Sequence, residues 1–342
     1  MEFNETRINY ARIKHFSHLY VFINAFQSLN LLVIGSLGNI MVIIVVLRRA
    51  VSGSPTNLYL LTLAAADLIF LNVTIIPNII ELNYPINHWH LGTFLCPVLV
   101  FLQYYSCNTS VIFITLFSHE RWVAICYPMK ARLVSNIDKV RVIIWSTWIS
   151  SFIYHSAWFY LAKTNIEKIN MKYFQKCTFR FNREYYKFIY IFDASMFYFL
   201  PLLLMSVFYI HIAYTLYVQK PFNLHTFSKS RSSRIQIIKM LMLVSISFAI
   251  LCLPYRTLVV YNSFSKKKFL DFWFLLFSKN MMLLNSAVNP IFYNVMSENF
   301  RRAFKKLILQ IIFGTKFNPS HNCYERKRSG SYISRISLMM RD

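Results

Sequence analysis

Residues 20–47 read YVFINAFQSLNLLVIGSLGNIMVIIVVL and contain no charged side chain. A helix rises about 1.5 Å per residue, so this run is about 42 Å long as a helix, whereas a bilayer core is about 30 Å thick. The excess of apolar residues extends over the whole chain, because 56% of its 342 residues are hydrophobic and only 15% are charged. A soluble domain carries roughly 25% charged residues. The composition therefore argues against a soluble globule and for a chain that spans a membrane.

Six further apolar runs follow the first one. Windows of about 19 residues predict seven spanning helices, and hence an all-α membrane protein with a seven-transmembrane helix bundle. The predicted helices are Tyr20–Leu47, Asn57–Ile80, Thr93–Ile125, Val140–Ala162, Phe188–Tyr217, Ile235–Asn262 and Phe269–Tyr293. The third and seventh are the weakest, because they contain Gln103, Asn108, Lys279 and Asn285. We retain both, since polar side chains are tolerated where they face the bundle interior.

The segments that flank the bundle, residues 20–293, differ from it in composition. Residues 1–19 are predicted to form an extracellular N-terminus and show no cleavable signal peptide. Residues 298–313 alternate basic and apolar side chains at helical spacing, which predicts an amphipathic helix on the lipids of the inner leaflet. Residues 314–342 are rich in Ser and Arg and are expected to form a disordered cytoplasmic tail.

Basic residues next to the helix ends predict the orientation of the bundle. They follow the first and seventh helices and fill the loops after the third and fifth: Arg48, Arg49, Lys130, Arg132, Lys139, Arg141, Lys229, Arg231, Arg234, Arg301, Arg302, Lys305 and Lys306. The positive-inside rule places this side in the cytoplasm and the N-terminus outside. Asn4 begins the sequon Asn4-Glu5-Thr6, which on the outer side is a glycosylation acceptor.

The formal net charge of +24 is not confined to the predicted inner side. The outer loops before the fifth and seventh helices are also basic, with Lys168, Lys172, Lys176, Arg180, Arg183, Lys266, Lys267 and Lys268. These side chains are either simply solvated or form an electrostatic funnel for a ligand that carries negative charge. Nucleic-acid binding is not indicated, because the basic residues lie between apolar runs and not on one polar face.

Polar residues deep in the predicted helices are functional candidates. A charged side chain at the bilayer centre costs at least about 2.5 kcal/mol on insertion scales. Asn39, Asp67, Asn285 and Asn289 lie in such positions, and with Ser110 they are expected to form a water-filled cluster. Asp67, Ser110 and Asn285 would there bind a small cation, namely an allosteric sodium ion. The alternative is a structural hydrogen-bond network without an ion.

The two ends of the third predicted helix suggest different roles. About 25 residues separate Cys96 from Arg121, which is roughly 37 Å of helix, so one end reaches each face of the membrane. Cys96, in an oxidising compartment, can form a disulfide with Cys177 and fix the second outer loop across the mouth of the bundle. Arg121 can pair with Glu120 in one state and release it in another. Pro254 permits a hinge in the sixth helix.

The chain resembles the rhodopsin-like (class A) G-protein-coupled receptors from about Gly35 to Phe304. The resemblance rests on motifs in one order and spacing: Gly38-Asn39, Leu63-Ala64-Ala65-Ala66-Asp67, Cys96, Glu120-Arg121-Trp122, Trp148, Pro201, Tyr209, Phe248, Pro254 and Asn289-Pro290-Ile291-Phe292-Tyr293. It implies a receptor and not an enzyme, with a heterotrimeric G protein, arrestin and receptor kinases as inner partners. It also implies that activation and coupling involve Glu120, Arg121, Tyr209, Phe248, Pro254, Asn289 and Tyr293.

A finer resemblance is to the thyrotropin-releasing hormone receptor group of neuropeptide receptors. It rests on Pro77–Ile79, Phe101–Tyr104, Leu253–Val260, Asn262–Phe264 and Trp273–Phe277. By this resemblance the residues that contact an amidated tripeptide are matched by Tyr104, Asn108, Tyr255, Arg256 and Lys279. Helical spacing adds Gln103 to the same face of the third helix.

Two residues depart from that group. Lys279 stands in place of an arginine and lacks the planar fork that grips a carbonyl at two points, so the ligand can differ from the vertebrate tripeptide. Cys252 stands where the family has a tryptophan below the pocket, which can alter coupling or basal activity.

The sequence therefore predicts a plasma-membrane receptor for a short, amidated neuropeptide that signals through a G protein, phospholipase C and calcium. The alternatives are a receptor for another peptide or a small acidic ligand, and a poorly signalling receptor-like scaffold. A transporter would be expected to show inverted repeats, and an intramembrane hydrolase would need converging His, Asp or Cys groups. Neither pattern is evident.

Overall fold

The structure is a computed structural model. It describes residues 16–49, 55–86, 88–134, 136–169, 172–217, 228–296 and 298–313. The sequon at Asn4 and the predicted tail, residues 314–342, lie outside the described residues. The chain up to Glu298 and the chain from Asn299 form two compact units, and each is described by itself.

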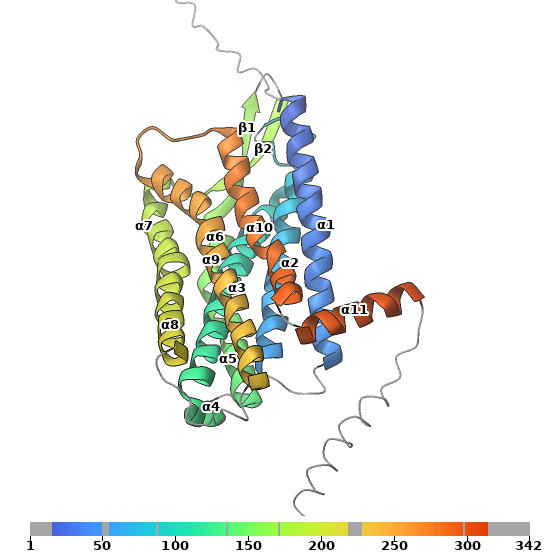
Figure 1. The fold of residues 1–342 in the computed structure, drawn as a ribbon. Helices are drawn as coiled ribbons and strands as arrows, with labels where there is room; N and C mark the ends of the chain where they lie inside the picture. Colours follow the sequence, from blue (N-terminus) through green and yellow to red (C-terminus); the bar gives the residue numbers. More distant parts are fainter. Residues whose placement is uncertain are drawn as a thin grey trace, which may run out of the picture. The chain divides into compact units, whose positions relative to one another are not determined.

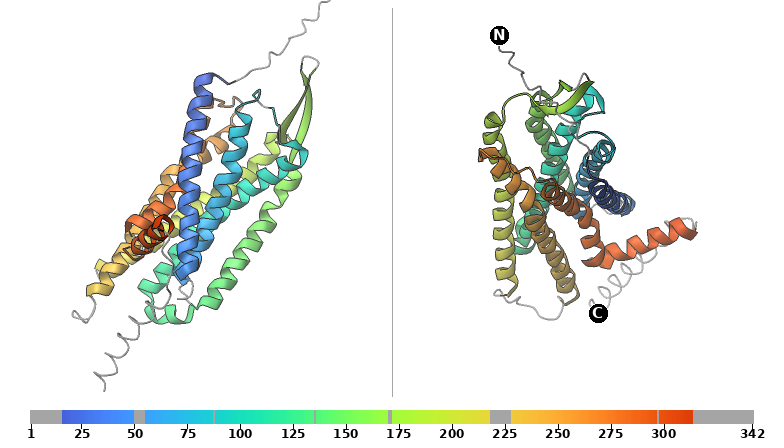
Figure 2. Two further views of the ribbon diagram at one scale, coloured as in Figure 1. Left: turned by 90° about the vertical axis from the view of Figure 1, so that its right-hand side faces the viewer. Right: turned by 90° about the horizontal axis from the view of Figure 1, so that it is seen from above.

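The first unit is a bundle of long helices that lie side by side (Figures 1 and 2). The long helices are α1 (His18–Arg49), α2 (Pro55–Glu81), α3 (Gly92–Cys126), α5 (Ile137–His155), α7 (Arg183–Ala194) continued by α8 (Leu200–Tyr217), α9 (Ser228–Phe264) and α10 (Phe272–Met296). Two short helices, α4 (Pro128–Val134) and α6 (Ala157–Leu161), flank α5. α3 contacts α2, α5, α8 and α9, so its side chains can meet those of most of the bundle. The predicted helical bundle is confirmed.

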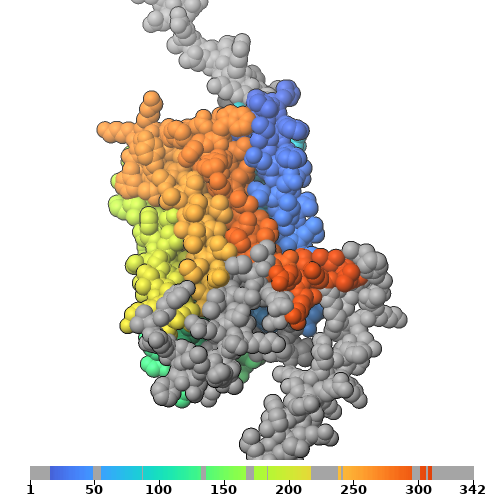
Figure 3. Space-filling view, in the orientation of Figure 1, coloured from blue at the N-terminus to red at the C-terminus, as the bar shows by residue number. Residues whose placement is uncertain are grey.

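The outer surface of the bundle is apolar. On α1 the side chains of Phe22, Phe26 and Leu37 are 69%, 61% and 57% exposed. α1, α7, α8, α9 and α10 all contribute to the face of the first unit seen in Figure 3. Exposed apolar groups on a helix are stabilised by lipid and not by water. The surface thus fits a bilayer.

Among the described residues, α1, α2, α3, the helix over 184–216 and α9 are long and apolar enough to cross a membrane by composition alone. α5 and α10 are not in this group. The expectation that the third and seventh helices are the weakest holds for the seventh, α10, which is not in this group. It fails for the third, because α3 is apolar enough to be in the group, whereas the fourth, α5, is not. In α10 the polar residues include Asn285 and Asn289, which are buried in the bundle, so average composition understates how apolar its outer surface is.

The fourth predicted span, Val140–Ala162, is wrong at its end. α5 stops at His155 and α6 begins at Ala157. The Ser156 hydroxyl donates to the carbonyl of Ile153 at 2.7 Å. A serine that bonds to nearby backbone in this way competes with the regular helical pattern. Ala162 then belongs to a strand.

The fifth span is also less regular than predicted. It begins at Arg183, five residues before the predicted Phe188, and a π-helical segment, Ser195–Phe199, separates α7 from α8. The N–H of Leu200 donates to the carbonyl of Ser195, five residues earlier. Pro201 has no N–H and cannot bond to the carbonyl four residues before it. We attribute the π segment to that missing donor.

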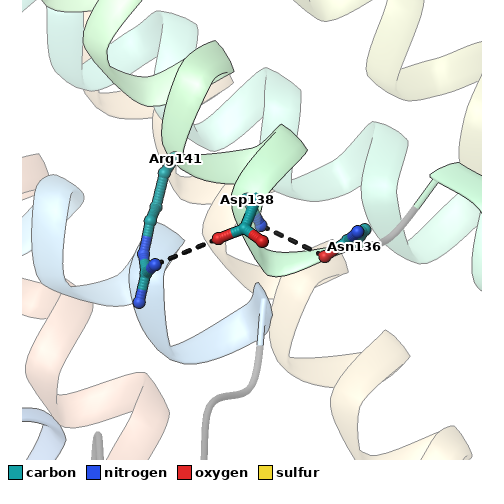
Figure 4. A network of polar contacts seen from close by, with 3 residues as sticks. All are labelled: Asn136, Asp138 and Arg141. Carbon is teal, nitrogen blue, oxygen red and sulfur yellow. Dashed lines mark hydrogen bonds and ion pairs between the residues drawn. The ribbon is translucent and has the colours of Figure 1, made fainter.

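The basic second inner loop of the prediction is mostly helical. Lys130 lies in α4, and Lys139 and Arg141 lie in the first turns of α5. Asn136 caps α5 by accepting from the N–H of Asp138 at 3.2 Å, and Arg141 donates to the Asp138 carboxylate at 3.1 Å (Figure 4). The Asn136 cap and the Asp138–Arg141 contact stabilise the N-terminus of α5. Because α4 ends at Val134 and α5 begins at Ile137, few residues are left for a loop between them.

A two-stranded hairpin covers one end of the bundle, which we call the hairpin end. β1 (Ala162–Ile169) pairs antiparallel with β2 (Lys172–Phe179), and Thr164 lies opposite Cys177. The predicted disulfide is present: it joins Cys177 to Cys96 near the start of α3, with a Cα–Cα distance of 5.6 Å. The N–H of Trp89 also donates to the carbonyl of Gln175 at 2.7 Å. Both contacts fix β2 over the helices.

The second unit contains α11 (Glu298–Phe313) except for its first residue. Its bounds coincide with the segment for which the sequence predicts an amphipathic helix. Along it, Arg301 and Arg302 are exposed, whereas Leu307 is 3% exposed.

Gly35 allows α1 to approach α2 and α10 closely. A Cβ at this position would lie 2.7 Å from Leu71 Cδ1 and 3.0 Å from Ala287 Cβ. Real Cβ atoms essentially never come as close as the first distance and seldom as close as the second, and both neighbours are buried and have little room to move. The absence of a side chain is thus a packing requirement at this three-helix crossing.

We expect Gly35→Val to destabilise the bundle by about 1–3 kcal/mol, the usual cost of overpacking a core. The measurement is thermal unfolding of the purified protein in detergent, followed through a thiol-reactive dye. Leu37→Ala, on the exposed side of the same helix, is the control and should change the midpoint little. An unchanged midpoint for Gly35→Val would contradict the close approach of the three helices.

Candidate functional site

A cavity of about 270 Å³ opens at the hairpin end between the helices. Its wall is formed by α1, α2, α3, β2, α9 and α10. All six residues predicted to contact a ligand line it: Gln103, Tyr104, Asn108, Tyr255, Arg256 and Lys279. The fold thus brings together residues that are up to 176 positions apart in the chain, because α3, α9 and α10 converge here.

Aromatic rings form one side of the cavity. Tyr104 stacks on Trp158 of α6, with ring centroids 4.1 Å apart and an interplanar angle of 6°. Trp158 is 2% exposed and also contacts Phe179 of β2 and Tyr190 of α7. Stacked rings of this kind are rigid and apolar. The hairpin and α7 are therefore fixed to the same wall as α3.

Gln103 lines the cavity, but part of its side chain is already bonded to another helix. Its side-chain N–H group donates to the backbone carbonyl of Val73 on α2 at 3.4 Å. This bond holds α3 to α2 and occupies one of its donors.

A chain of hydrogen bonds crosses the floor of the cavity. Arg256 Nη2 of α9 lies 2.6 Å from Asn108 Oδ1 of α3. Asn108 Nδ2 lies 2.9 Å from His155 Nε2 of α5, and His155 Nδ1 lies 2.7 Å from the carbonyl of Ser151. Asn108 is 1% exposed and His155 is fully buried. Three helices are thereby connected through polar groups in an otherwise apolar region.

The lining of the cavity holds two basic side chains and one acidic side chain. Arg256 and Lys279 are the bases, and Glu81 at the end of α2 is the acid. This balance is less positive than that of the loop between α9 and α10, where Lys266, Lys267 and Lys268 are exposed. The cavity can thus offer N–H donors at two places and an oxygen acceptor at a third.

A second cavity of about 240 Å³ adjoins the first at the hairpin end. The two share Glu81, Cys177 and Lys279. The second cavity adds Lys176 and His88 to the wall. A ligand longer than the first cavity can therefore extend beside the hairpin without crossing the bundle.

The prediction missed three residues at or beside this site. Glu81 lines the cavity, His155 bonds to Asn108, and Asp193 lines a small neighbouring pocket that shares Tyr104, Tyr255 and Arg256 with the cavity. His155 and Asp193 are buried within predicted spans, and Glu81 lies one residue beyond the second predicted span. Asp193 is 1% exposed, and the Tyr154 hydroxyl donates to its Oδ1 at 2.6 Å. The rule that marked Asp67, a polar group within an apolar run, would also have marked His155 and Asp193.

The middle of the bundle contains the predicted polar cluster. The Ser110 hydroxyl donates to Asp67 Oδ1 at 2.7 Å, and Asn289 Nδ2 donates to Asp67 Oδ2 at 2.7 Å. Asn39 Nδ2 donates to the carbonyls of Gly35 and Ser286. These bonds connect α1, α2, α3 and α10.

Asn285 lies in the same region. Among the described residues, Asp67 bonds to Ser110 and Asn289 and not to Asn285. The side-chain oxygen of Asn285 is buried and has no hydrogen-bond partner among these residues, and the same holds for the side-chain oxygens of Asn39 and Asn289. Three buried amide oxygens in this region thus accept no hydrogen bond from the described residues, although buried polar atoms are usually paired.

The opposite end of the bundle holds the residues predicted to couple activation. Glu120 and Arg121 form an ion pair at 3.7 Å, which is too long for a hydrogen bond. Tyr209 of α8 bonds to Ser118 of α3 at 2.8 Å and accepts from Ser245 of α9 at 3.3 Å. The three hydroxyls therefore connect three helices.

The remaining predicted coupling residues lie deeper. Phe248 and Tyr293 are each 1% exposed. The ring centroids of Phe248 and Tyr198 are 5.6 Å apart. Phe248 lies one helical turn before the buried Cys252. Pro254 lies inside α9. Cys252 has a much smaller side chain than the tryptophan that the family resemblance leads one to expect there. Phe248, one turn earlier, therefore provides the large buried ring below this position of α9.

Comparison with known proteins places these observations in a family. Residues 38–293 match the profile described as 7 transmembrane receptor (rhodopsin family). The thyrotropin-releasing hormone receptor of Mus musculus is 39% identical over 299 residues, which cover 80% of this chain and 76% of that protein. The receptor of the same name from Homo sapiens is 38% identical, with 80% and 75% covered. The QRFP-like peptide receptor of Branchiostoma floridae is 28% identical over 282 residues, with 80% and 73% covered.

We expect Tyr154→Phe to lower stability by about 1–3 kcal/mol, because it removes the donor that bonds to a buried carboxyl group. Thermal unfolding in detergent measures this effect. Tyr160→Phe is the matched control, since the Tyr160 side chain is 60% exposed. Equal midpoints for the two variants would show that the hydroxyl does not support Asp193.

Proposed function

The chain belongs to the rhodopsin family of seven-transmembrane receptors, and from this premise we propose that it binds a short, C-terminally amidated peptide in the hairpin-end cavity. As a member of this family it is a multi-pass plasma-membrane receptor that acts on a G protein, and it is not an enzyme. The observation that carries the ligand proposal is the convergence of the six candidate residues on one cavity. The similarity to receptors named for thyrotropin-releasing hormone supports a peptide of that kind.

The chemistry of the cavity favours a ligand with rings and carbonyl groups. Tyr104 and Tyr255 offer aromatic surface, and Arg256 and Lys279 offer charged donors to carbonyl or carboxamide oxygens. Glu81 offers an acceptor to a ligand N–H group. Because lysine binds as a point charge and not as a fork, we expect Lys279 to discriminate less between carboxamide and carboxylate than an arginine would.

The orientation follows from the charge rule. We propose that the hairpin end and the N-terminus are extracellular, that Asn4 is glycosylated, and that residues 298–313 lie on lipids of the inner leaflet. Arrestin and receptor kinases would then meet the cytoplasmic tail, residues 314–342.

Activation is a population shift between two states of the bundle. The peptide would bind the active state better, α9 would move about Pro254, and the contacts of Arg121, Tyr209 and Tyr293 would rearrange. The long Glu120–Arg121 pair at 3.7 Å is a weak latch and suits an equilibrium that a ligand can shift. Coupling through phospholipase C and calcium is the route that the family resemblance favours.

We also propose an allosteric sodium ion beside Asp67, with Ser110 and Asn285 as further ligands. The side-chain oxygens of Asn39, Asn285 and Asn289, which accept no hydrogen bond among the described residues, support it, since sodium prefers oxygen ligands. Bound sodium would supply positive charge next to the buried carboxylate. Asp67 and Asn289 would then hold α2 and α10 together in the inactive state.

The peptide proposal predicts a calcium response to thyrotropin-releasing hormone or to another amidated peptide in cells that display the receptor. Lys279→Glu should raise the half-maximal concentration about 10–100-fold, because a charge-assisted hydrogen bond contributes about 1.5–3 kcal/mol. Lys279→Arg should retain the response. Cyclic AMP is read in parallel to detect other G-protein routes.

Lys267→Glu is the control, because that side chain is exposed outside the cavity. If no amidated peptide raises calcium or changes cyclic AMP while surface labelling is normal, the proposal fails. A response to acidic peptides without an amide would replace it by the acidic-ligand alternative. An unchanged dose curve for Lys279→Glu would remove Lys279 from the site.

The sodium proposal predicts that sodium chloride raises the unfolding midpoint of the purified receptor relative to choline chloride at equal concentration, since a ligand of the folded state stabilises it. Asp67→Asn should abolish the difference. Asp138→Asn, at an exposed carboxylate, should not. The same sodium effect in wild type and Asp67→Asn would refute the site.

A further inference from the structure

His155 lies at the end of the hydrogen-bond chain that reaches the cavity, and it does not line the cavity itself. Its ring is fully buried and lies against Tyr105, Tyr154 and Phe197, with centroid distances of 6.2, 4.8 and 5.5 Å. Aromatic neighbours on several sides limit rotation of the imidazole. The position of both ring nitrogens is therefore fixed.

The hydrogen bonds of His155 have only one consistent direction for a neutral ring. Nδ1 lies 2.7 Å from the carbonyl oxygen of Ser151, which can only accept, so Nδ1 carries the hydrogen. Nε2 of the same neutral ring then has a lone pair and accepts. It follows that Asn108 turns its Nδ2 toward His155, at 2.9 Å.

This direction determines what Asn108 presents to α9. With Nδ2 turned to His155, Oδ1 faces Arg256 and accepts from its Nη2 at 2.6 Å. A flipped amide would place two donors against each other and would leave buried polar groups unsatisfied. The guanidinium retains further N–H groups that can donate into the cavity.

We propose that His155 is a positioning residue of the ligand site: it sets the orientation of the Asn108 amide and thereby holds the Arg256 guanidinium where a ligand carbonyl or carboxamide can accept from it. The inference rests on the proposed function in one respect, namely that Arg256 contacts the ligand. His155 acts through Asn108 and touches no ligand. The residue at position 155 thus adjusts ligand affinity from the fourth helix of the bundle.

The test uses two amide substitutions that differ in reach. The terminal amide of His155→Gln extends to the place of Nε2 and can accept from Asn108. The shorter amide of His155→Asn reaches only the place of Nδ1, so it retains a donor to Ser151 but loses Asn108. A purely structural role would not favour glutamine, which loses the Ser151 bond.

With thyrotropin-releasing hormone as the probe in the calcium assay, His155→Asn should raise the half-maximal concentration about 10-fold or more, and His155→Gln less than about threefold. In an Asn108→Ala background, His155→Asn should have little further effect. Equal losses for glutamine and asparagine, or full additivity with Asn108→Ala, would overturn the proposal. Surface labelling normalises each response.

A second measurement does not need a ligand. Thermal unfolding of the purified receptor is recorded for His155→Asn, Asn108→Ala and the double variant. The relay predicts coupling, with the double variant melting close to Asn108→Ala, whereas independent sites would show additive shifts. Additive shifts here would overturn the relay. If the hormone is inactive on wild type while this coupling is present, the hormone as ligand is wrong and the positioning of Asn108 stands.

Discussion

A polar group inside a bilayer has no water to bond with, and the bundle is organised by the need to satisfy such groups internally. Asp67 accepts from Ser110 and from Asn289, each at 2.7 Å, and Asn39 bonds to the backbone of α1 and α10. The bonds to Asp67 and the bond from Asn39 to Ser286 join different helices, whereas the bond from Asn39 to Gly35 lies within α1. These polar contacts position the helices together with apolar packing between them, as at Gly35 and around Trp158.

The same constraint explains the second network nearer to the hairpin end. Arg256, Asn108 and His155 bond to one another across α9, α3 and α5, and the Tyr154 hydroxyl donates to one carboxyl oxygen of Asp193. The two networks differ in their access to the cavity. Asp67 lies below it, whereas Asn108 and Arg256 form part of its wall. A ligand that accepts from the remaining N–H groups of Arg256 therefore binds to a side chain that already holds two helices together, and this is how binding can shift the balance between states.

Much of the fold could be predicted because lipid imposes length and composition on each helix. The first three helices begin and end within a few residues of their predicted bounds. The prediction failed where local backbone bonding decides the structure: at Ser156, where α5 ends early, and at Ser195–Phe199, where the helix widens before Pro201. It also gave no indication of the strand pairing between Thr164 and Cys177, because a basic loop carries no periodic apolar signal.

The sequence by itself determined the number of helices, the Cys96–Cys177 disulfide and the six residues that share one cavity, because apolar length and the family motifs are local in the chain. Only the tertiary structure decided which of those residues are already bonded to each other, as Arg256 is to Asn108. It also decided that His155, Asp193 and Glu81 belong to the site. Their roles depend on side chains that are far apart in sequence, and hydrogen-bond partners of that kind are set by how the helices pack and not by any one helix.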